Sequence, residues 1–167
     1  MLVYTYELLS QRKDILRAWQ NKFQYILIDE TQDMNQLQYD IVKLLAAPEN
    51  NLFMVGDDDQ SIYRFRGARP EIMLGFEKDY PDAKRILLDT NYRSRKQIVE
   101  SSLKVIGNNE HRFSKELKAA RAEGNPVITA VFDNQKEEYD CMIEKILFYH
   151  KQGGKYSDIA ILCRTNR

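Results

Sequence analysis

The chain has 167 residues, 43% of them hydrophobic, and its 25 lysine and arginine residues balance 25 aspartate and glutamate residues. This composition suffices for the core of one ordinary domain or parts of two, and the balanced charge gives no general sign of a nucleic-acid partner, although a local basic stripe is compatible with it. The apolar runs are shorter than the roughly 20 residues of a membrane-spanning helix, and no secretory leader opens the chain, so we expect a cytoplasmic protein without a membrane partner. The two cysteines and two histidines lack metal-ligand spacing, and we expect none of them to bind a metal.

Helical and strand patterns alternate from the N-terminus. Residues 2–22 lack glycine and proline and have a helix-forming composition, which predicts one helix or two. The apolar run YILI at 25–28 then predicts a buried strand. Asn35 is a suitable N-cap for an amphipathic helix that Pro48 ends. Strand followed by helix is the α/β signature.

Two further strands are predicted in the same half of the chain. Residues 51–55 repeat the short apolar pattern, Pro70 fits the first turn of another helix, and residues 85–88 predict a third strand. Because helices would connect these strands, we expect the strands to be parallel and their polar carboxyl ends to share one edge of one sheet.

The second half of the chain has a weaker pattern. A helix should end at Gly107, and the polar segment 108–125 is interpreted as a connection with at most a short helix. Residues 126–132 predict a strand, 139–150 a helix, and 159–163 a last strand. The chain stops soon afterwards, so we expect the last element to be cut, as in a fragment.

The first polar cluster follows the first predicted strand in ILIDETQD. Asp29 and Glu30 stand where that strand should end, which is where ligands bind in open α/β sheets. An aspartate there can hold Mg²⁺, and a glutamate can orient and deprotonate a water that attacks a phosphate. Taken alone, the pair is a weak signal, because in most proteins an apolar run followed by Asp-Glu only places two solvated carboxylates at a strand end.

The second cluster is GDDDQSIYRFRGA. Gln60 follows an acidic turn and could sense a γ-phosphate, while Tyr63 and Phe65 could stack on bases and Arg66 could meet a phosphate. The alternative places the two aromatic rings in the core and the arginines in solvent.

The third cluster, LDTNYRS, places Tyr92 next to Arg93, a pair that can stack on a base and hold a phosphate. Such a pair alone is common on protein surfaces. In this order and spacing, however, the three clusters resemble motifs II, III and IV of superfamily 1 DNA helicases of the UvrD/Rep/PcrA type. The C-terminal IAILCRTNR resembles a motif found early in the second motor domain of that family.

The resemblance covers essentially the whole chain and implies an α/β fold. Residues 1–92 would form the C-terminal part of a RecA-like motor domain, a parallel sheet with helices of the P-loop NTPase type. Residues 93–167 would begin a second RecA-like domain. The implied activity is that of an ATP-dependent DNA helicase, which couples ATP hydrolysis to translocation on single-stranded DNA and to duplex unwinding. ATP and Mg²⁺ are the implied cofactors, and single-stranded and duplex DNA the implied partners.

The resemblance also implies roles for single residues of the ATP site. Asp29 would bind Mg²⁺ and Glu30 would be the catalytic base. Gln60 would couple the γ-phosphate to DNA, Arg93 would act as an arginine finger, and Tyr92 would stack on the adenine. The residues implied to line the single-stranded DNA track are Tyr63, Phe65 and Arg66.

Two positions depart from the usual family pattern. Many relatives have tryptophan where this chain has Phe65, which keeps a smaller stacking face. Thr31 replaces the aromatic residue that commonly follows the Asp-Glu pair, a change that concerns local packing.

The phosphate-binding pattern GxxxxGK[ST] does not occur in the 167 residues. We therefore expect this chain by itself neither to hydrolyse ATP efficiently nor to bind ATP and Mg²⁺ tightly. Two alternatives stay open: the motor part of a helicase-nuclease subunit, and a non-catalytic nucleic-acid-binding module that keeps the motor fold.

Overall fold

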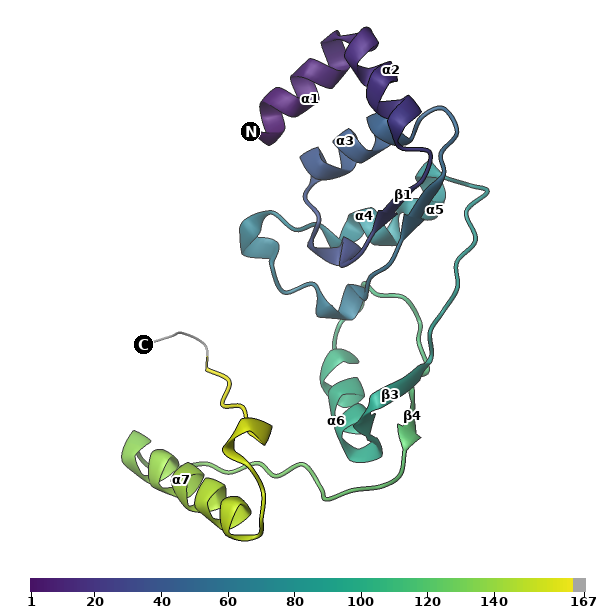
Figure 1. Cartoon of the computed structure of the whole chain (residues 1–167). Coiled ribbons are helices and arrows are strands. Elements are labelled where there is room, and N and C mark those ends of the chain that lie inside the picture. Colours follow the sequence, from purple (N-terminus) through teal and green to yellow (C-terminus); the bar gives the residue numbers. More distant parts are fainter. Residues whose placement is uncertain (164–167) are drawn as a thin grey trace. The chain divides into compact units, whose positions relative to one another are not determined.

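The computed structural model describes residues 1–163 of the chain. They form a mixed α/β structure that divides into two compact units, the second of which begins at Pro126 (Figure 1). In the described part of the chain, no helix combines the length and the apolar composition needed to cross a membrane.

The first unit opens with two helices, α1 (Leu2–Gln11) and α2 (Lys13–Lys22). They are separated at Arg12, whose φ of −103° and ψ of 86° are not helical. The predicted helical segment is therefore two helices rather than one.

A strand, a helix and a second strand follow as predicted. Strand β1 (Ile26–Ile28) pairs in parallel with β2 (Leu52–Met54), in the register Ile26 to Leu52. Helix α3 (Gln36–Ala46) connects them. Asn35 and Gln38 form a reciprocal capping box at the start of α3, because each side chain accepts a hydrogen bond from the other's backbone N–H at 2.9 Å.

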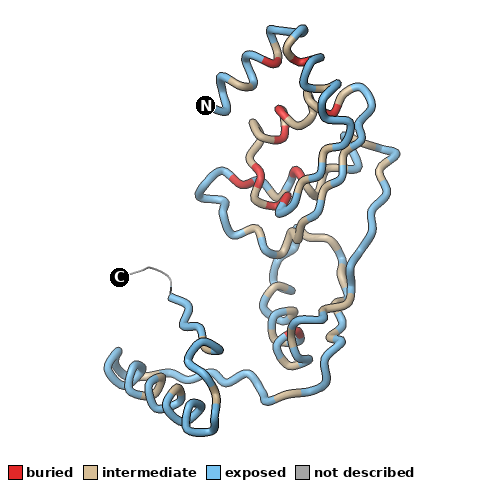
Figure 2. The backbone as a smooth tube through the Cα atoms, viewed as in Figure 1, coloured by how far each residue is buried: buried red, intermediate tan, exposed pale blue. Residues whose placement is uncertain are grey.

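Helix α3 lies between two hydrophobic clusters, which contain most of the buried residues in Figure 2. One cluster joins α3 to α1 and α2 through Leu9, Leu16 and Ile41. The other joins α3 to the sheet and to the short helices α4 (Pro70–Leu74) and α5 (Phe76–Asp79) through Met34, Tyr39 and Ile72. Pro70 begins α4, as predicted, and Gly75 separates α4 from α5.

The β1–β2 sheet is covered on one face. Ile28 and Met54 pack against the second cluster. The side chains of Leu27 and Phe53, which are register partners and alternate with them, are 71% and 56% exposed. The prediction of a buried strand is thus wrong, since helices pack against only one face of this sheet.

The third predicted strand is displaced along the chain. Residues 85–88 have no strand structure, and Ile86 and Leu88 are each 78% exposed. Strand β3 (Thr90–Arg95) begins later, precedes α6 (Lys96–Ile106), and pairs in parallel with β4 (Lys118–Arg121), which lies within the segment predicted to be a connection. Within residues 1–163 there are thus two separate two-stranded sheets, and the prediction of three strand ends at one edge is wrong.

The second unit contains one long helix, α7 (Gln135–Lys151). The Asn134 side chain accepts a hydrogen bond from the Glu137 N–H at 3.0 Å and caps its start, and Gly153, with a φ of 91°, follows its end. The strands predicted at 126–132 and 159–163 are absent from the described residues, because no partner strand is placed beside either segment. Residues 164–167 of the IAILCRTNR motif lie outside the described residues.

Candidate functional site

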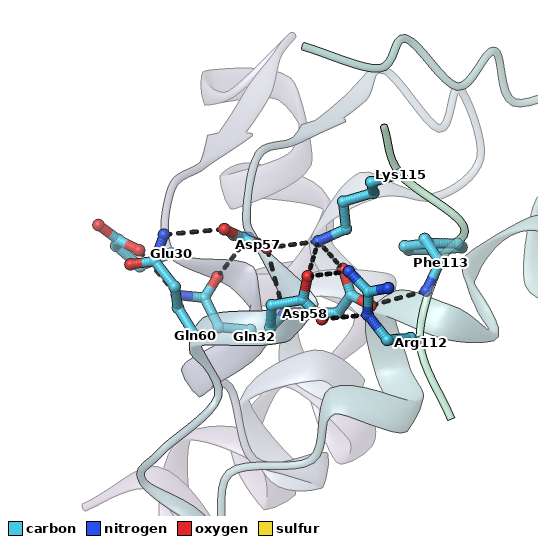
Figure 3. A network of polar contacts seen from close by, with 9 residues as sticks. Glu30, Gln32, Asp57, Asp58, Gln60, Arg112, Phe113 and Lys115 are labelled. Atoms are coloured by element: carbon cyan, nitrogen blue, oxygen red, sulfur yellow. Dashed lines mark hydrogen bonds and ion pairs between the residues drawn. The ribbon is translucent and has the colours of Figure 1, made fainter. Parts of the chain in front are cut away.

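Asp29 and Glu30 form a tight turn directly after β1 (Figure 3 shows Glu30 and its neighbours). Glu30 has a φ of 51° and a ψ of 42°, in the left-handed region that is unfavourable by about 1 kcal/mol for a residue with a Cβ. Its backbone N–H donates to Asp29 Oδ1 at 2.9 Å. Both residues are exposed, so the turn presents two carboxylates to solvent at the carboxyl end of the strand.

Gln32 joins this turn to the end of β2. It lies in the short 3-10 helix η1 (Thr31–Asp33) and is only 2% exposed. Gln32 Nε2 donates to Glu30 Oε2 at 2.7 Å, and Gln32 Oε1 accepts from the Asp57 backbone N–H at 3.0 Å. Gln32 is not among the site residues predicted from the sequence, although its position two residues after Glu30 could have pointed to it.

Thr31 and Gly56 hold the two strand ends close together. Thr31 is fully buried, and both its backbone N–H and its Oγ1 donate to the Val55 carbonyl, at 2.9 and 2.8 Å. A Cβ on Gly56 would lie 2.6 Å from Gln32 Oε1 and 3.1 Å from the Thr31 backbone nitrogen. A residue larger than glycine at position 56 would therefore displace the Gln32 side chain.

Gln60 joins the same hydrogen-bonded group through Asp57. It ends the 3-10 helix η2 (Asp58–Gln60), and its Nε2 donates to Asp57 Oδ2 at 2.8 Å. Asp57 thus binds Gln60 through its carboxylate and Gln32 through its backbone N–H. The structure therefore links Glu30 and Gln60, two residues predicted from separate motifs, through Gln32 and Asp57 (Figure 3).

Three consecutive aspartates at this turn form ion pairs with two cations from residues 112–115. Lys115 Nζ contacts the carboxylates of Asp57, Asp58 and Asp59. Arg112 donates two hydrogen bonds to the Asp59 carboxylate, at 2.8 and 2.6 Å. The three carboxylates have the spacing of a cation site, but the Lys115 ammonium lies among them. We call these five residues the acidic-turn cluster.

The ion pairs of the acidic-turn cluster shift pKa values in the expected directions. Burial raises the pKa of Asp57, but hydrogen bonds from Lys115 and Gln60 outweigh burial and hold this pKa below its usual value. Hydrogen bonds from Arg112 hold the pKa of Asp59 below its usual value despite burial. Burial lowers the pKa of Lys115, but the three carboxylates outweigh it and raise this pKa. These groups are therefore charged at neutral pH.

Asp29 has the chemistry of a Mg²⁺ ligand. Mg²⁺ in phosphate-transfer sites is commonly held by one or two carboxylates together with substrate phosphates and water. Asp29 is exposed, and the hydrogen bonds among the described residues engage only its Oδ1. An exposed aspartate beside Glu30 fits this role.

Tyr63, Phe65 and Arg66 form an exposed aromatic and basic group around the 3-10 helix η3 (Arg64–Arg66). The two ring centroids are 5.9 Å apart, and the Arg66 Cζ lies 4.9 Å from the Tyr63 ring and 5.4 Å from the Phe65 ring. Phe65 is 78% exposed, which excludes the alternative that its ring belongs to the core. Exposed rings next to a guanidinium can stack on bases and bind phosphate.

Tyr92 and Arg93 are not part of the hydrogen-bonded group that links Glu30 to Gln60. Both are exposed residues of β3, which belongs to the other sheet. Within residues 1–163, no hydrogen bond or ion pair joins either of them to Asp29, Glu30 or Gln60. The structure thus brings together the residues of the first two motifs and does not add those of the third.

Carboxylates at a strand end, hydrogen-bonded to a glutamine-bearing turn, can act on phosphates, and an exposed aromatic and basic turn can bind single-stranded nucleic acid. Two family models match the chain: the UvrD/REP helicase N-terminal domain over residues 1–81, and the UvrD-like helicase C-terminal domain over residues 86–167. The chain belongs to the UvrD/REP helicase family.

Curated relatives match nearly the whole chain. It is 48% identical over 162 residues to a putative ATP-dependent DNA helicase, YjcD, of Bacillus subtilis, with 96% of this chain and 21% of the relative covered. It is 44% identical over 166 residues to the ATP-dependent DNA helicase PcrA of Staphylococcus aureus, with 99% of this chain and 23% of the relative covered. The chain thus spans between one fifth and one quarter of the length of these relatives.

The two family models meet between residues 81 and 86, and the acidic-turn cluster joins the segments on either side of this boundary. Asp57, Asp58 and Asp59 lie in the segment matched by the N-terminal model, whereas Arg112 and Lys115 lie in the segment matched by the C-terminal model. This contact could not be predicted from the sequence, because residues 108–125 carry no local pattern that points to position 57.

Proposed function

We propose that this chain is a motor segment of an ATP-dependent DNA helicase, which couples ATP hydrolysis to movement along single-stranded DNA and to duplex unwinding. The observation that carries the proposal is the hydrogen-bonded link between Glu30 and Gln60 through Gln32 and Asp57. A motor needs such a link because hydrolysis at one residue must respond to what another residue binds. The names of the relatives, which are ATP-dependent DNA helicases, support the same activity.

The proposed fold is RecA-like, of the P-loop NTPase type, with residues 1–92 in a first motor domain and residues 93–167 in a second. The parallel β1–β2 pair with its α3 connection supports this assignment. The family-model boundary between residues 81 and 86 lies close to the proposed division.

In this proposal, different residues of the chain have different roles in ATP hydrolysis. Glu30 orients the attacking water and accepts a proton from it at its carboxylate, and the Gln60 amide couples the γ-phosphate to DNA. Tyr92 stacks on the adenine, and Arg93 stabilises the charge that develops on the transferred phosphoryl group. Asp29 would hold Mg²⁺, and that ion would supply neutralisation of the phosphate charge.

Single-stranded DNA would bind at the exposed group of Tyr63, Phe65 and Arg66. Bases can stack on the two rings, and the guanidinium can pair with a phosphate. This group follows Gln60 after only two intervening residues, so a change in DNA contact can move Gln60. Duplex DNA as a second substrate and a cytoplasmic location stay predictions.

The test uses a family-length protein, by which we mean a protein of the relatives' length in which residues 1–167 form the matching segment. We expect its ATP hydrolysis to be stimulated by single-stranded DNA. The Glu30→Gln variant should lose turnover while it still binds ATP, because the amide keeps the shape of the side chain but cannot accept a proton. Steady-state hydrolysis and binding of a fluorescent ATP analogue measure the two effects. Retained turnover would contradict the role of Glu30.

The 167-residue chain by itself should show no ATP hydrolysis above background, because the phosphate-binding pattern is absent from its sequence. The control is the Glu30→Gln variant of the same chain. Hydrolysis that is present in the unaltered chain and absent from the variant would contradict this expectation.

A further inference from the structure

Gln32 is a buried polar side chain for which the proposed mechanism has no direct use. It is 2% exposed, and both ends of its carboxamide are hydrogen-bonded, to Glu30 on one side and to the Asp57 backbone on the other (Figure 3). Its backbone carbonyl also accepts from Ser61 Oγ at 3.1 Å. Gln32 is thus fixed to the segment that carries Gln60 by its side chain and by its main chain.

The chemistry of this position requires a glutamine. A carboxamide offers a donor and an acceptor on one planar group, and here the donor faces a carboxylate while the acceptor faces an N–H. A glutamate would keep the acceptor for Asp57 but would place a second carboxylate against Glu30. A methionine would keep much of the volume and lose both hydrogen bonds.

Glu30 depends on this contact for its orientation. Its backbone is held by the left-handed turn, but its side chain is exposed and has several rotatable bonds. Among the described residues, the hydrogen bond from Gln32 Nε2 is the only one that engages the Glu30 carboxylate. A catalytic group displaced by about 1 Å can lose on the order of 100-fold in rate.

We propose that Gln32 is the positioning residue that holds the Glu30 carboxylate in register with Asp57 and therefore with Gln60. This inference rests on the proposed function, in which Glu30 is the base that activates water. Gln32 acts through Glu30 and does not touch substrate. Because Gln32 is bonded to Asp57, a shift of the segment that carries Gln60 moves the Glu30 carboxylate as well.

The decisive experiment compares Gln32→Met and Gln32→Glu in the family-length protein. Both variants should lower kcat for DNA-stimulated ATP hydrolysis by about 10-fold to 100-fold, with the KM for ATP changed less than about threefold, because orientation and not binding is lost. Gln36→Met is the matched control: Gln36 lies on α3 with its amide bonded to Asp40, it makes no hydrogen bond to Glu30 among the described residues, and kcat should be unchanged.

Combination with Glu30→Gln separates positioning from a general structural role. If Gln32 acts through Glu30, adding Gln32→Met to Glu30→Gln should lower the residual rate no further. Independent, multiplicative losses would overturn the proposal, as would a Gln32→Met protein with kcat within about threefold of the unaltered protein. A Gln32→Glu variant with normal kcat would also overturn it, because that variant keeps only the bond to Asp57.

Two further measurements keep the proposal testable if the Gln32 variants do not fold or if the helicase activity is absent. Gly56→Ala places a Cβ 2.6 Å from Gln32 Oε1, which displaces the Gln32 carboxamide, and should lower kcat in the same way without raising KM. In the 167-residue chain by itself, Glu30→Ala should accelerate hydrogen exchange of the Gln32 side-chain amide by about 10-fold, because the protecting carboxylate is gone. Absence of DNA-stimulated hydrolysis in the unaltered protein refutes the proposed function, whereas unchanged amide exchange refutes the positioning contact.

Discussion

Replacing Lys115 by methionine removes the cation that the three aspartates of the acidic-turn cluster share. The Lys115 side chain is 8% exposed, and those of Asp58 and Asp59 are 1% and 11% exposed. Removing one partner of a buried ion pair costs about 3–5 kcal/mol, because it leaves a buried charge without compensation. Asp57 is 35% exposed and Arg112 still pairs with Asp59, so we expect the lower end, a loss of about 3 kcal/mol in the free energy of unfolding.

Urea unfolding of the 167-residue chain, followed by circular dichroism, measures this loss as a lower midpoint with an unchanged m-value. Lys96→Met is the matched control, because Lys96 pairs with Glu123 at 2.8 Å on the surface, and its removal should leave the midpoint nearly unchanged. A loss below about 1 kcal/mol for Lys115→Met, within the range of surface pairs, would refute the inference that this cluster is an important contact.

The pH dependence of the same measurement follows from the pKa shifts. The pKa values of Asp57 and Asp59 are lowered in the folded protein. Their contribution to the free energy of unfolding is therefore present above the ordinary carboxyl pKa of about 4 and is lost as the pH falls through the lowered values. The pKa of Lys115 is raised, so its contribution is complete below its ordinary value of about 10.4 and is lost as the pH rises through the raised value. The difference in the free energy of unfolding between the unaltered chain and Lys115→Met should thus be constant near neutral pH and shrink in strong acid. An undiminished difference there would contradict the electrostatic explanation.

Three other substitutions test the site. Gly56→Ala should lower the free energy of unfolding by about 2–3 kcal/mol, because the new Cβ would lie 2.6 Å from Gln32 Oε1. In a Gln32→Ala background most of this loss should disappear. An equal loss in both backgrounds, measured by urea unfolding, would contradict the clash. Phe65→Ala in the family-length protein should weaken binding to single-stranded DNA by about 10-fold in fluorescence anisotropy, because a stacked base is worth about 1–3 kcal/mol. Arg66→Ala should lower the salt dependence of that binding by about one phosphate contact, and unchanged affinity and salt dependence would contradict the proposed DNA-binding role of these residues.

Within the acidic-turn cluster, residues 57–59 make contacts other than those with Gln32. These residues contact Gln32 and Gln60 on one side, and Arg112 and Lys115 on the other. The turn at residues 57–59 therefore has two sets of contacts. It links Glu30 to Gln60, and it binds Arg112 and Lys115, which lie in the segment matched by the C-terminal family model. Motion of either segment would reach Glu30 through the same hydrogen bonds.

The sequence by itself determined the features that depend on neighbouring residues. Asn35 caps α3 and Pro70 begins α4, because capping and the fixed φ of proline are local effects. Asp29 and Glu30 follow β1 as predicted, because a short apolar run between polar residues limits where that strand can end.

Only the tertiary structure decided which strands exist beyond the first pair and which charges meet. Residues 85–88 and 126–132 have strand-like composition but no strand structure, because a strand forms only where a partner offers hydrogen bonds, whereas β4 pairs with β3 despite its polar sequence. Lys115 meets Asp57 across 58 residues of sequence. No local periodicity encodes a contact at that separation, since it is set by how the connected elements pack.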